Sequence, residues 1–562
     1  MTNWDFETDI LVVGSGAGAL TAALGAKEQN AEVMVIEKTE LYGGTSAMSG
    51  GVVWLPASPM ITEVGGEDSL EEARIYMTNV INEPHLEHRI DAYLQGSAKL
   101  TDFIAANTPI KLIPNAYYAD MYPESPGAKW QYRAHEPDIF DGRTLGEELY
   151  RLRRQHPQTS MFGVIGWSAD EATMMQTRAR GWFKTAVTMV MRYLLDIPGR
   201  LRGTRDRRLV LGGSLVGGLR LAMLQRNMDI ITECAAQEYI LKDNRVIGIK
   251  VLHKGKLKTI RAHKGIILAS GGFEKSQSMR EKNLPGPTNI NWTAGSPGNT
   301  GEMIERAIEI GADVEFMDEA WWGPTICIPG ELQARMLIIE KNLPGSIIVN
   351  KNGERIVNEG SSYTKVVKNI LRANTIDSES VPAYFIFDAK YRHRYPLGPM
   401  LPSEIMPDWI LSSSIKQWVK KGDSLHELAE KLDIDGPGLE ATVRNINHYA
   451  ETGKDEEFHR GDSVYDQMYG DMSVEPNPCL GGLDKAPYYG VPIFPGDLGT
   501  KGGIKVNEFS QVQKASGEII EGLYATGNCS APLMGRTYPA SGSTLGPAMV
   551  FGLIAARHAL SG

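Results

Sequence analysis

The chain has 562 residues, of which 42% are apolar, and its formal net charge is −10. Two to four domains are expected from this length, and the negative charge argues against nucleic acid as the main partner. The four cysteines, Cys234, Cys327, Cys479 and Cys529, form no CxxC pair, which indicates a reducing compartment and gives no metal-ligand pattern.

The N-terminal segment MTNWDFETD is polar and acidic and leads directly into an apolar stretch. It has neither the basic start nor the apolar centre of a signal peptide. No run of about 18 apolar residues without charges is found, so no membrane-spanning helix is expected. These features predict a cytoplasmic protein of enzyme size.

Residues 9–38 have the pattern strand, glycine turn, helix, strand. The apolar run ILVV is typical of a buried parallel strand. Gly14, Gly16 and Ala19 fill the three small positions of the dinucleotide fingerprint, which permit a tight turn, a close pyrophosphate and close helix packing. Glu37 ends the second strand, where an acid accepts hydrogen bonds from ribose hydroxyls. Together these features predict a bound dinucleotide at the start of the helix.

Residues 41–51, LYGGTSAMSGG, follow directly and are rich in glycine and serine. Gly43, Gly44, Thr45 and Ser46 add little bulk, so their backbone amides can line a flat ring and its phosphates. The segment favours a flavin over a nicotinamide. A plain flexible loop is the alternative.

Residues 181–213 mix basic side chains with large apolar ones such as Trp182, Phe183, Met189 and Leu194. A basic, apolar, amphipathic stretch of this kind can lie on a membrane surface. A lid or a domain-packing helix is the alternative, and the sequence leaves both open.

Two later segments repeat the pattern of a strand followed by glycines. They are GIILASGGFE at 265–274 and GLYATGN at 522–528. With the first turn they make three strand-to-glycine corners, which suggests one cofactor held by both ends of the chain. Residues 296–314 read as a helix with a glycine stop, and the turn around Asn299 at its start either caps the helix or also touches the pyrophosphate.

The tail GRTYPASGSTLG, residues 535–546, places Tyr538 beside a proline and follows it with Ala540, Ser541, Gly542 and Ser543. Taken alone, it could be a turn leading into a helix with an exposed tyrosine.

Several stretches of the chain resemble a known family. DILVVGSGAGALTAA, EKTELYGGTSAMSGG and LASGGFE are similar to flavoproteins of the fumarate reductase/succinate dehydrogenase type. More specific stretches resemble the 3-ketosteroid 1-dehydrogenases: GSIIVNKNGERIVNEGSSY (345–363), EEFHRGDSVYD (456–466), DLGTKGGI (497–504) and GRTYPASGSTLGPAMVF (535–551). The resemblance covers nearly the whole chain and is weakest from about 120 to 230.

The resemblance implies an α/β fold with a Rossmann-like FAD-binding domain made of residues 1–280 and 490–562. An α+β substrate domain, residues 281–489, is inserted between these two parts. Stretches rich in proline and glycine at 283–287 and 490–497 suit the crossings. Motifs and resemblance together predict the cofactor-binding residues Gly14, Gly16, Ala19, Glu37, Lys38, Gly43, Gly44, Thr45, Ser46, Ser49, Gly50, Gly51, Ala236, Ala269, Gly271, Gly272, Asn299, Gly527, Asn528 and Leu545.

Members of this family take one proton and one hydride from carbons 1 and 2 of a 3-ketosteroid, and the hydride goes to the flavin. The resemblance implies that the Tyr538 hydroxyl and the Gly542 backbone N–H donate to the 3-keto oxygen as an oxyanion hole. Glycine is expected at 542 because a side chain there would push the substrate away. An external electron acceptor then reoxidises the flavin.

Tyr363 matches the family base. The family has proline before this tyrosine, and this chain has Ser362, which leaves the shape of the loop open. An unperturbed phenol has a pKa of about 10, so a tyrosinate needs stabilisation by a hydroxyl donor, the flavin site or a helix dipole.

A second family tyrosine supports the base, and its match here is in NAYYADMYPESPGA, residues 115–128. Alignment on the following PE places Met121 at that position, so Tyr118 or Tyr122 must substitute. Tyr118 is the predicted residue. Both tyrosines could instead be wall residues of an apolar pocket.

Other functions remain alternatives at this point. A 3-ketosteroid 4-ene (5α) dehydrogenase would keep FAD and move the tyrosines, and a fumarate-reductase-like enzyme would need arginine and histidine clamps, for which Arg536 is the nearest candidate. A flavin-binding protein without activity is the third. His459 and Arg460 are expected to form a structural turn, and residues 181–208 are the expected membrane contact.

Overall fold

The buried aliphatic run of β1 (Phe6–Val13) makes it a central strand of an eight-stranded sheet in the computed structural model, which describes residues 4–177 and 179–561. The order along the sheet is β10 (Ile230–Ile231), β2 (Val33–Ile36), β1, β13 (Lys256–Leu268), β12 (Arg245–His253) and β11 (Cys234–Lys242). Two strands near the C-terminus, β23 (Ile519–Ala525) and β22 (Gln511–Gln513), extend the sheet from β13.

Strands β1, β13 and β23 are parallel neighbours although they come from three distant parts of the chain. Leu11 pairs with Ile266, and Ile266 pairs with Leu523. Because carboxyl ends of parallel neighbours meet at one edge, the three predicted glycine corners lie together there. The α/β class predicted from the sequence is confirmed.

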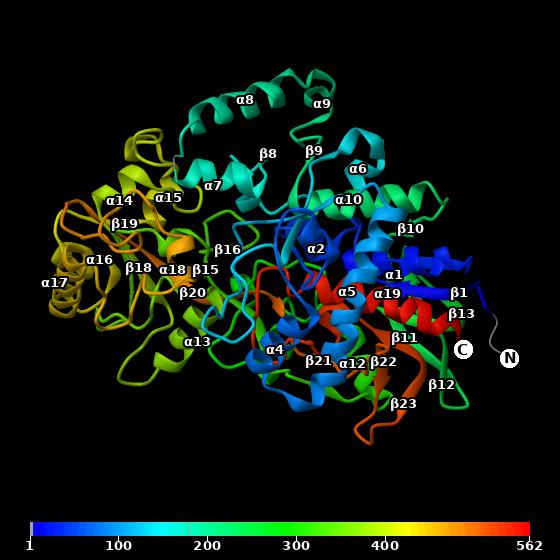
Figure 1. The fold of residues 1–562 in the computed structure, drawn as a ribbon. Coiled ribbons are helices and arrows are strands. Elements are labelled where there is room, and N and C mark those ends of the chain that lie inside the picture. The colour runs from blue at the N-terminus through cyan, green and yellow to red at the C-terminus, as the bar shows by residue number, and fades with distance from the viewer. Residues whose placement is uncertain (1–3, 178, 562) are drawn as a thin grey trace.

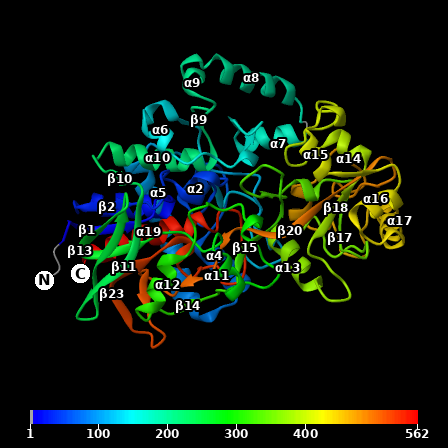
Figure 2. The same cartoon turned by 180° about the vertical axis from the view of Figure 1, so that it is seen from behind.

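The two ends of the chain are joined by helices α1 (Ala17–Glu28) and α19 (Leu545–Ser561), which Figures 1 and 2 show beside each other in blue and red. Glycines allow this close approach. A Cβ on Gly18 would lie 2.7 Å from the Ala548 carbonyl oxygen, and one on Gly552 would lie 2.5 Å from the Gly18 oxygen. The start of β1 and the end of α19 lie on the same side of the molecule in the two views.

The second large sheet has six strands and is antiparallel. Its order is β16 (Arg335–Met336), β15 (Ala320–Ile326), β20 (Tyr488–Thr500), β18 (Ala383–Phe387) and β17 (Ser346–Val349), with β19 (Lys420–Gly422) also paired to β20. Helix α13 (Tyr363–Ala373) packs on β15, and α16 (Leu425–Leu432) and α17 (Gly436–Thr452) cover the far end. β20 runs across residue 490, so the boundaries of the two domains stay a prediction.

Residues 181–202 form α8 (Trp182–Leu195) and α9 (Ile197–Arg202), which lie at the outer edge of the molecule in both views (Figures 1 and 2). α8 packs on α7 (Ala169–Thr177) and buries Met189 in a small apolar cluster. In the part of the chain that the structure describes, no helix combines the length and the apolar character needed to cross a bilayer.

Candidate active site

A cavity of about 420 Å³ opens where the glycine corners after β1, β13 and β23 meet. It reaches from these corners to a group of tyrosines. Eighteen of the predicted cofactor-binding residues line it: Gly14, Gly16, Ala19, Glu37, Lys38, Gly44, Thr45, Ser46, Ser49, Gly50, Gly51, Ala236, Ala269, Gly271, Asn299, Gly527, Asn528 and Leu545.

Two predicted cofactor-binding glycines, Gly43 and Gly272, are outside the lining of the cavity. Local packing accounts for both. A Cβ on Gly43 would lie 2.7 Å from the Ala47 Cβ, and one on Gly272 would lie 2.2 Å from the Thr500 Oγ1. Gly43 therefore leaves room for Ala47 in the helical turn that follows it, and Gly272 allows the segment around Thr500 to approach.

The turn after β1 requires glycine at position 14. Its φ is +112°, and a Cβ would lie 2.2 Å from the Ala269 carbonyl oxygen. Gly16 is the N-cap of α1 and offers no side chain to the amides of the first turn. One of these amides, that of Ala17, donates to the Ser46 Oγ at 3.0 Å. Small residues and a helix start on the cavity fit the phosphates of a dinucleotide.

Glu37 follows β2 and has both carboxylate oxygens engaged. Oε1 accepts from the backbone N–H and the Oγ1 hydroxyl of Thr39, each at 2.8 Å. Oε2 accepts from the Ser15 hydroxyl at 2.5 Å. These contacts fix the carboxylate on the cavity wall, where an acid would meet ribose hydroxyls.

The second glycine-rich segment is tied to the turn before α12 (Glu302–Glu309). The Thr45 Oγ1 accepts from the Ser296 N–H at 3.0 Å and from the Asn299 amide at 3.1 Å. α12 is shorter than the predicted helix and begins after Gly301, whose φ is +80°. Asn299 precedes the helix and lines the cavity, whereas the N-cap of α12 is Gly301, which has no side chain to cap it.

The space beside Gly44 is open, which leaves room for the flavin nucleotide in this part of the cavity. A Cβ on Gly44 would meet no atom within 4 Å. With the helix start and the oriented carboxylate of Glu37, this end of the cavity fits FAD.

At the other end of the cavity, Tyr363 and Tyr538 contact each other edge to face. Their ring centroids are 5.5 Å apart and their planes are inclined by 64°. Trp321 makes a similar contact with Tyr538 at 5.1 Å. Tyr363 begins α13, whereas Tyr538 lies in the loop before α19. The structure therefore brings Tyr363, Tyr538 and Gly542 into one cavity.

The backbone conformation and packing at position 542 require glycine, apart from any contact with a substrate. The φ of Gly542 is +91°, and a Cβ would lie 2.6 Å from the Trp54 nitrogen and 2.8 Å from the Val52 oxygen. A side chain at this position would therefore also clash with the backbone around β3 (Val53–Trp54).

The surroundings keep both phenols protonated at neutral pH. Burial raises the pKa of Tyr363 well above 10, and the neighbouring phenols of Tyr538, Tyr465 and Tyr469 add to this rise. Burial also raises the pKa of Tyr538, while a hydrogen bond from Tyr363 and the Gly542 N–H oppose that rise. The side chains around Tyr363 therefore do not supply the lowered pKa that a resting tyrosinate would need.

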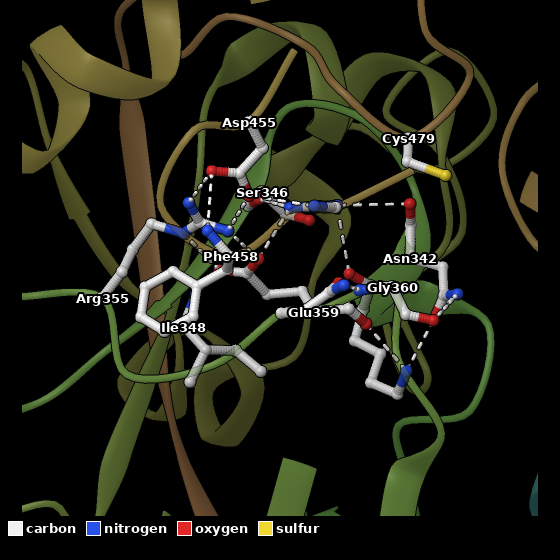
Figure 3. A network of polar contacts seen from close by, with 12 residues as sticks. Asn342, Ser346, Ile348, Arg355, Glu359, Gly360, Asp455, Phe458 and Cys479 are labelled. Carbon is white, nitrogen blue, oxygen red and sulfur yellow. Dashed lines mark hydrogen bonds and ion pairs between the residues drawn. The ribbon is translucent and has the colours of Figure 1, made fainter. Parts of the chain in front are cut away.

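A network of buried charged side chains contacts the segment that precedes Tyr363 (Figure 3). Arg355 lies between two carboxylates, with Nη2 at 2.7 Å from the Glu359 Oε2 and 2.9 Å from the Asp455 Oδ2. Arg460 approaches the same Glu359 oxygen at 3.3 Å and donates to the Ser346 carbonyl at 2.7 Å. Arg460 thus has the structural role expected from the sequence.

Lys341 extends this network to the residues just before Tyr363. Its Nζ donates to the carbonyls of Glu359 and Ser361 at 2.8 and 2.6 Å, and the Asn342 amide donates to the Gly360 carbonyl at 2.8 Å. Three successive carbonyls are therefore held. Burial lowers the pKa of Lys341 to about 7.

Ser362 takes the place of the family proline without changing the path of the chain. Its φ of −56° and ψ of 141° lie in the region that proline adopts. Its Oγ accepts from the Lys365 N–H and caps α13. The loop shape left open by the sequence is therefore the one proline would favour.

Lysines also hold the backbone just before Tyr538. Lys501 donates to the Thr537 carbonyl, and Lys368 of α13 donates to the Arg536 carbonyl at 2.8 Å. Burial lowers the pKa of Lys501 to about 7. Sequence reasoning missed these lysines; Lys501 lies inside the motif DLGTKGGI, which was the available signal.

Of the two tyrosines considered in the segment 115–128, Tyr118 lines the cavity. Its hydroxyl donates to the Glu136 Oε1 at 2.9 Å. The Tyr122 ring instead contacts the Lys365 ammonium at 4.8 Å. Met121 is buried, and its backbone N–H donates a hydrogen bond to the Pro539 carbonyl oxygen at 2.7 Å.

Tyr469 is a further cavity tyrosine that sequence reasoning missed. It follows α18 (Val464–Met468) and interacts with the Ser541 hydroxyl. Burial raises the pKa of Tyr469, as it does for the other phenols of the cavity.

Comparison with known proteins assigns the chain to a family and finds relatives that are similar over almost its whole length. Residues 9–545 match the family described as FAD binding domain. The chain is 36% identical to the 3-oxosteroid 1-dehydrogenase of Mycobacterium tuberculosis (strain ATCC 25618 / H37Rv), over 98% of each chain. It is 37% identical to the enzyme of that name from Mycolicibacterium smegmatis, over 98% of this chain and 96% of the other.

A solved structure is also similar over almost the whole length. The 3-ketosteroid delta1-dehydrogenase from Sterolibacterium denitrificans, crystallised with 1,4-androstadiene-3,17-dione, is 41% identical and superposes with a TM-score of 0.95. The match covers 99% of this chain and 100% of that one.

Proposed function

The chain belongs to the 3-oxosteroid 1-dehydrogenase family of FAD-binding flavoproteins, and from this we propose that it acts as an FAD-dependent 3-oxosteroid 1-dehydrogenase. Its reaction removes one hydrogen from each of carbons 1 and 2 of ring A of a 3-ketosteroid. The observation that carries this proposal is the meeting of Tyr363, Tyr538 and Gly542 in the cavity that fits FAD at its other end.

When bound, FAD supplies the hydride acceptor. The protein must orient ring A and handle the proton. A hydrogen at carbon 2 becomes acidic when the negative charge that develops on the 3-keto oxygen is stabilised. The Tyr538 hydroxyl and the Gly542 N–H are the two donors that we assign to this oxygen. Both residues line the cavity. The Gly542 N–H also interacts with the Tyr538 hydroxyl, which supports the assignment of both donors to the same ketone oxygen.

Tyr363 is the base that we assign to carbon 2. It is the first residue of α13, where the helix dipole favours developing negative charge. Its raised pKa means that it is neutral before substrate binds, so its hydroxyl must pass its proton on as it takes a new one. Tyr118 is the residue that we assign to support it, because Tyr118 faces the same cavity and Tyr122 does not line it.

We also propose that α8 and α9 contact a lipid surface, from which an apolar substrate can be taken. One face of α8 exposes Phe183, Val187, Met191 and Leu194, of which Phe183 is 67% exposed. The supporting helix α7 lines the cavity through Ala169, Asp170 and neighbouring residues, so α8 packs on a helix that forms part of the cavity wall. A folded lid would not require so many apolar side chains in water.

The lipid contact is tested by sedimentation with anionic phospholipid vesicles. A variant carrying Phe183→Ser, Met191→Ser and Leu194→Ser should stay in the supernatant while the parent protein pellets with lipid. Leu332→Ser is the matched control, because Leu332 is 95% exposed elsewhere. Equal pelleting of the parent and the triple variant would contradict the membrane contact.

The proposed reaction is tested by product analysis. Under anaerobic conditions, a 3-ketosteroid saturated at carbons 1 and 2 should bleach the yellow protein and yield the 1-ene product. A 4-ene product from a ring-saturated substrate would indicate the alternative 4-ene (5α) dehydrogenase. Bound flavin that no steroid bleaches would indicate a flavin-binding protein without this activity. An external electron acceptor is then required for turnover.

A further inference from the structure

The motif DLGTKGGI, residues 497–504, contains a buried lysine to which the proposed reaction gives no role. Lys501 is 1% exposed and directly follows β20. Its backbone N–H donates to the Glu319 carbonyl at 3.0 Å. A Cβ on Gly502 would lie 2.3 Å from the Met317 Cα, so glycine is needed for the segment to pack this closely. The backbone of Lys501 is therefore held in place, and its side chain extends from a fixed position.

The end of the Lys501 side chain contacts two immediate neighbours of Tyr538. Its Nζ donates to the carbonyl of Thr537, in the peptide directly before the tyrosine. The same Nζ lies 4.4 Å from the centroid of the Trp321 ring. That ring contacts the Tyr538 ring at 5.1 Å, and its Nε1–H donates to the Asn528 Oδ1 at 3.0 Å. One ammonium group thus contacts both the backbone and the aromatic neighbour of the same phenol.

The charge of Lys501 is balanced only in part by a carboxylate. Burial lowers the pKa of Lys501 to about 7, the Glu319 charge raises it, and the Lys368 and Arg536 charges lower it further. Glu319 itself pairs with Lys368 at 2.8 Å and with Arg536 at 3.5 Å. A buried ammonium group in such surroundings needs a hydrogen-bond acceptor and an aromatic face in fixed positions. The backbone carbonyl and the indole ring described above provide them.

Tyr538 depends on its neighbours because it lies in a loop outside the helices and strands. Lys501 is not part of the lining of the cavity that contains Tyr538, so it acts on a substrate only through other residues. A second cavity, of about 30 Å³, adjoins both Lys501 and Trp321 and gives the indole ring room to shift if the ammonium group is lost. A misplacement of a reacting group by about 1 Å can slow a reaction by about 10²-fold.

We infer that Lys501 is a positioning residue for Tyr538. Its ammonium group holds the Thr537 carbonyl and the Trp321 ring, and these two neighbours direct the phenol hydroxyl to the ketone oxygen of the substrate. Lys501 itself takes no part in proton or hydride transfer. The inference rests on the proposed dehydrogenase reaction, in which Tyr538 is a donor to that oxygen.

The test measures hydrogen bonding to the ketone oxygen directly and without turnover. A 1,4-diene-3-ketosteroid, the product of the proposed reaction, is labelled with carbon-13 at carbon 3 and bound to the oxidised, flavin-loaded protein. The pH is kept about one unit below the pKa of Lys501, so that the lysine is protonated. Hydrogen bonds to a carbonyl oxygen lower its infrared stretching frequency. Tyr538→Phe should raise this frequency above that of the parent protein, and Lys501→Met should produce a clear part of the same rise.

Two further variants complete the comparison. Lys501→Gln should also raise the frequency, because its amide can donate a hydrogen bond but carries no charge to hold the Trp321 ring. If Lys501→Met does not retain flavin, Lys501→Gln alone decides. Lys514→Met is the matched control, since Lys514 is partly exposed and pairs with Glu518, and it should keep the parent frequency.

Steady-state kinetics give a second readout. Lys501→Met should lower kcat about tenfold or more and change KM by less than about threefold, because the interaction with the ketone oxygen strengthens as charge develops on it. A lysine that only stabilised the fold would lower the melting temperature and leave the frequency and kcat of the folded protein unchanged.

The positioning role would be overturned by the parent frequency in both lysine variants, with kcat within about threefold of the parent. If Tyr538→Phe also keeps the parent frequency, or if the parent protein does not bind the ketosteroid, the proposed reaction fails instead. The two failures are distinguishable because Tyr538→Phe is measured beside the lysine variants.

Discussion

The ring of Tyr363 meets the ring of Tyr538 edge to face, with centroids 5.5 Å apart. One residue begins a helix on the second sheet, and the other belongs to the C-terminal tail. The contact brings the assigned base next to the assigned donor to the ketone oxygen. Because separate parts of the chain hold each phenol, the two can be tested separately.

Replacing Tyr363 by Phe removes the assigned base and keeps the ring contact with Tyr538. A positioned acid or base typically contributes 10²- to 10⁴-fold, so kcat for 1-ene formation should fall within about this range. Flavin content and melting temperature should stay close to those of the parent protein. Rapid-mixing measurement of flavin bleaching checks the rate. A rate within a few fold of the parent would remove Tyr363 as the base.

Ser362→Pro should leave the enzyme active. The backbone angles of Ser362, −56° and 141°, are those that proline favours, although the substitution removes the cap of α13. The loss of a cap costs about 1 kcal/mol, part of which the stiffer unfolded chain offsets. Activity and melting temperature measure the effect. Inactive but folded protein would show that the loop differs from the family form.

Lys341→Met should destabilise the protein by about 2 kcal/mol or more, because buried carbonyls lose their donor. The folded-state pKa of Lys341, about 7, lies below the value of about 10.4 in the unfolded chain. The unfolded chain therefore binds more protons between these values, and this lysine makes stability rise with pH across that window. The deficit of Lys341→Met should accordingly grow from pH 7 to pH 10.

Denaturant unfolding at several pH values measures this prediction. Lys351→Met is the control, because Lys351 is partly exposed, pairs with the exposed Asp433 and should change stability by less than about 1 kcal/mol. A Lys341→Met deficit that shrinks as pH rises would contradict the assigned pKa direction.

Glu37→Ala should weaken FAD binding. The carboxylate is oriented by Thr39 and Ser15 and can accept ribose hydroxyls, and hydrogen bonds to charged groups contribute about 1.5–3 kcal/mol. FAD affinity, measured by reconstitution of the flavin-free protein, should fall about tenfold to hundredfold. Glu32→Ala, an exposed residue before β2, should bind FAD as the parent does.

The FAD end of the cavity was predictable from sequence because local patterns specify it. The strand before Gly14, the helix after Gly16 and the acid at Glu37 lie in one short stretch, and the structure has the strand, turn and helix there. The glycine corners after β13 and β23 follow the same local rule, so their meeting could be expected from parallel pairing.

The residues that hold the substrate end of the cavity in place could not be predicted from local sequence patterns. Lys341 and Lys501 act on backbone carbonyls that are distant in sequence, and no local pattern signals such contacts. The constraint on Gly542 comes from β3, another distant segment. Tyr469 and Glu136 also join the site only through tertiary packing.

The central claim is that the Tyr538 hydroxyl and the Gly542 amide hold the ketone oxygen of a 3-ketosteroid. Anaerobic rapid mixing of Tyr538→Phe with a 3-ketosteroid tests this most directly, beside the parent protein with equal flavin content. Loss of one such donor is expected to slow flavin bleaching by about 10²- to 10³-fold. Bleaching at the parent rate, with the same 1-ene product, would contradict the claim.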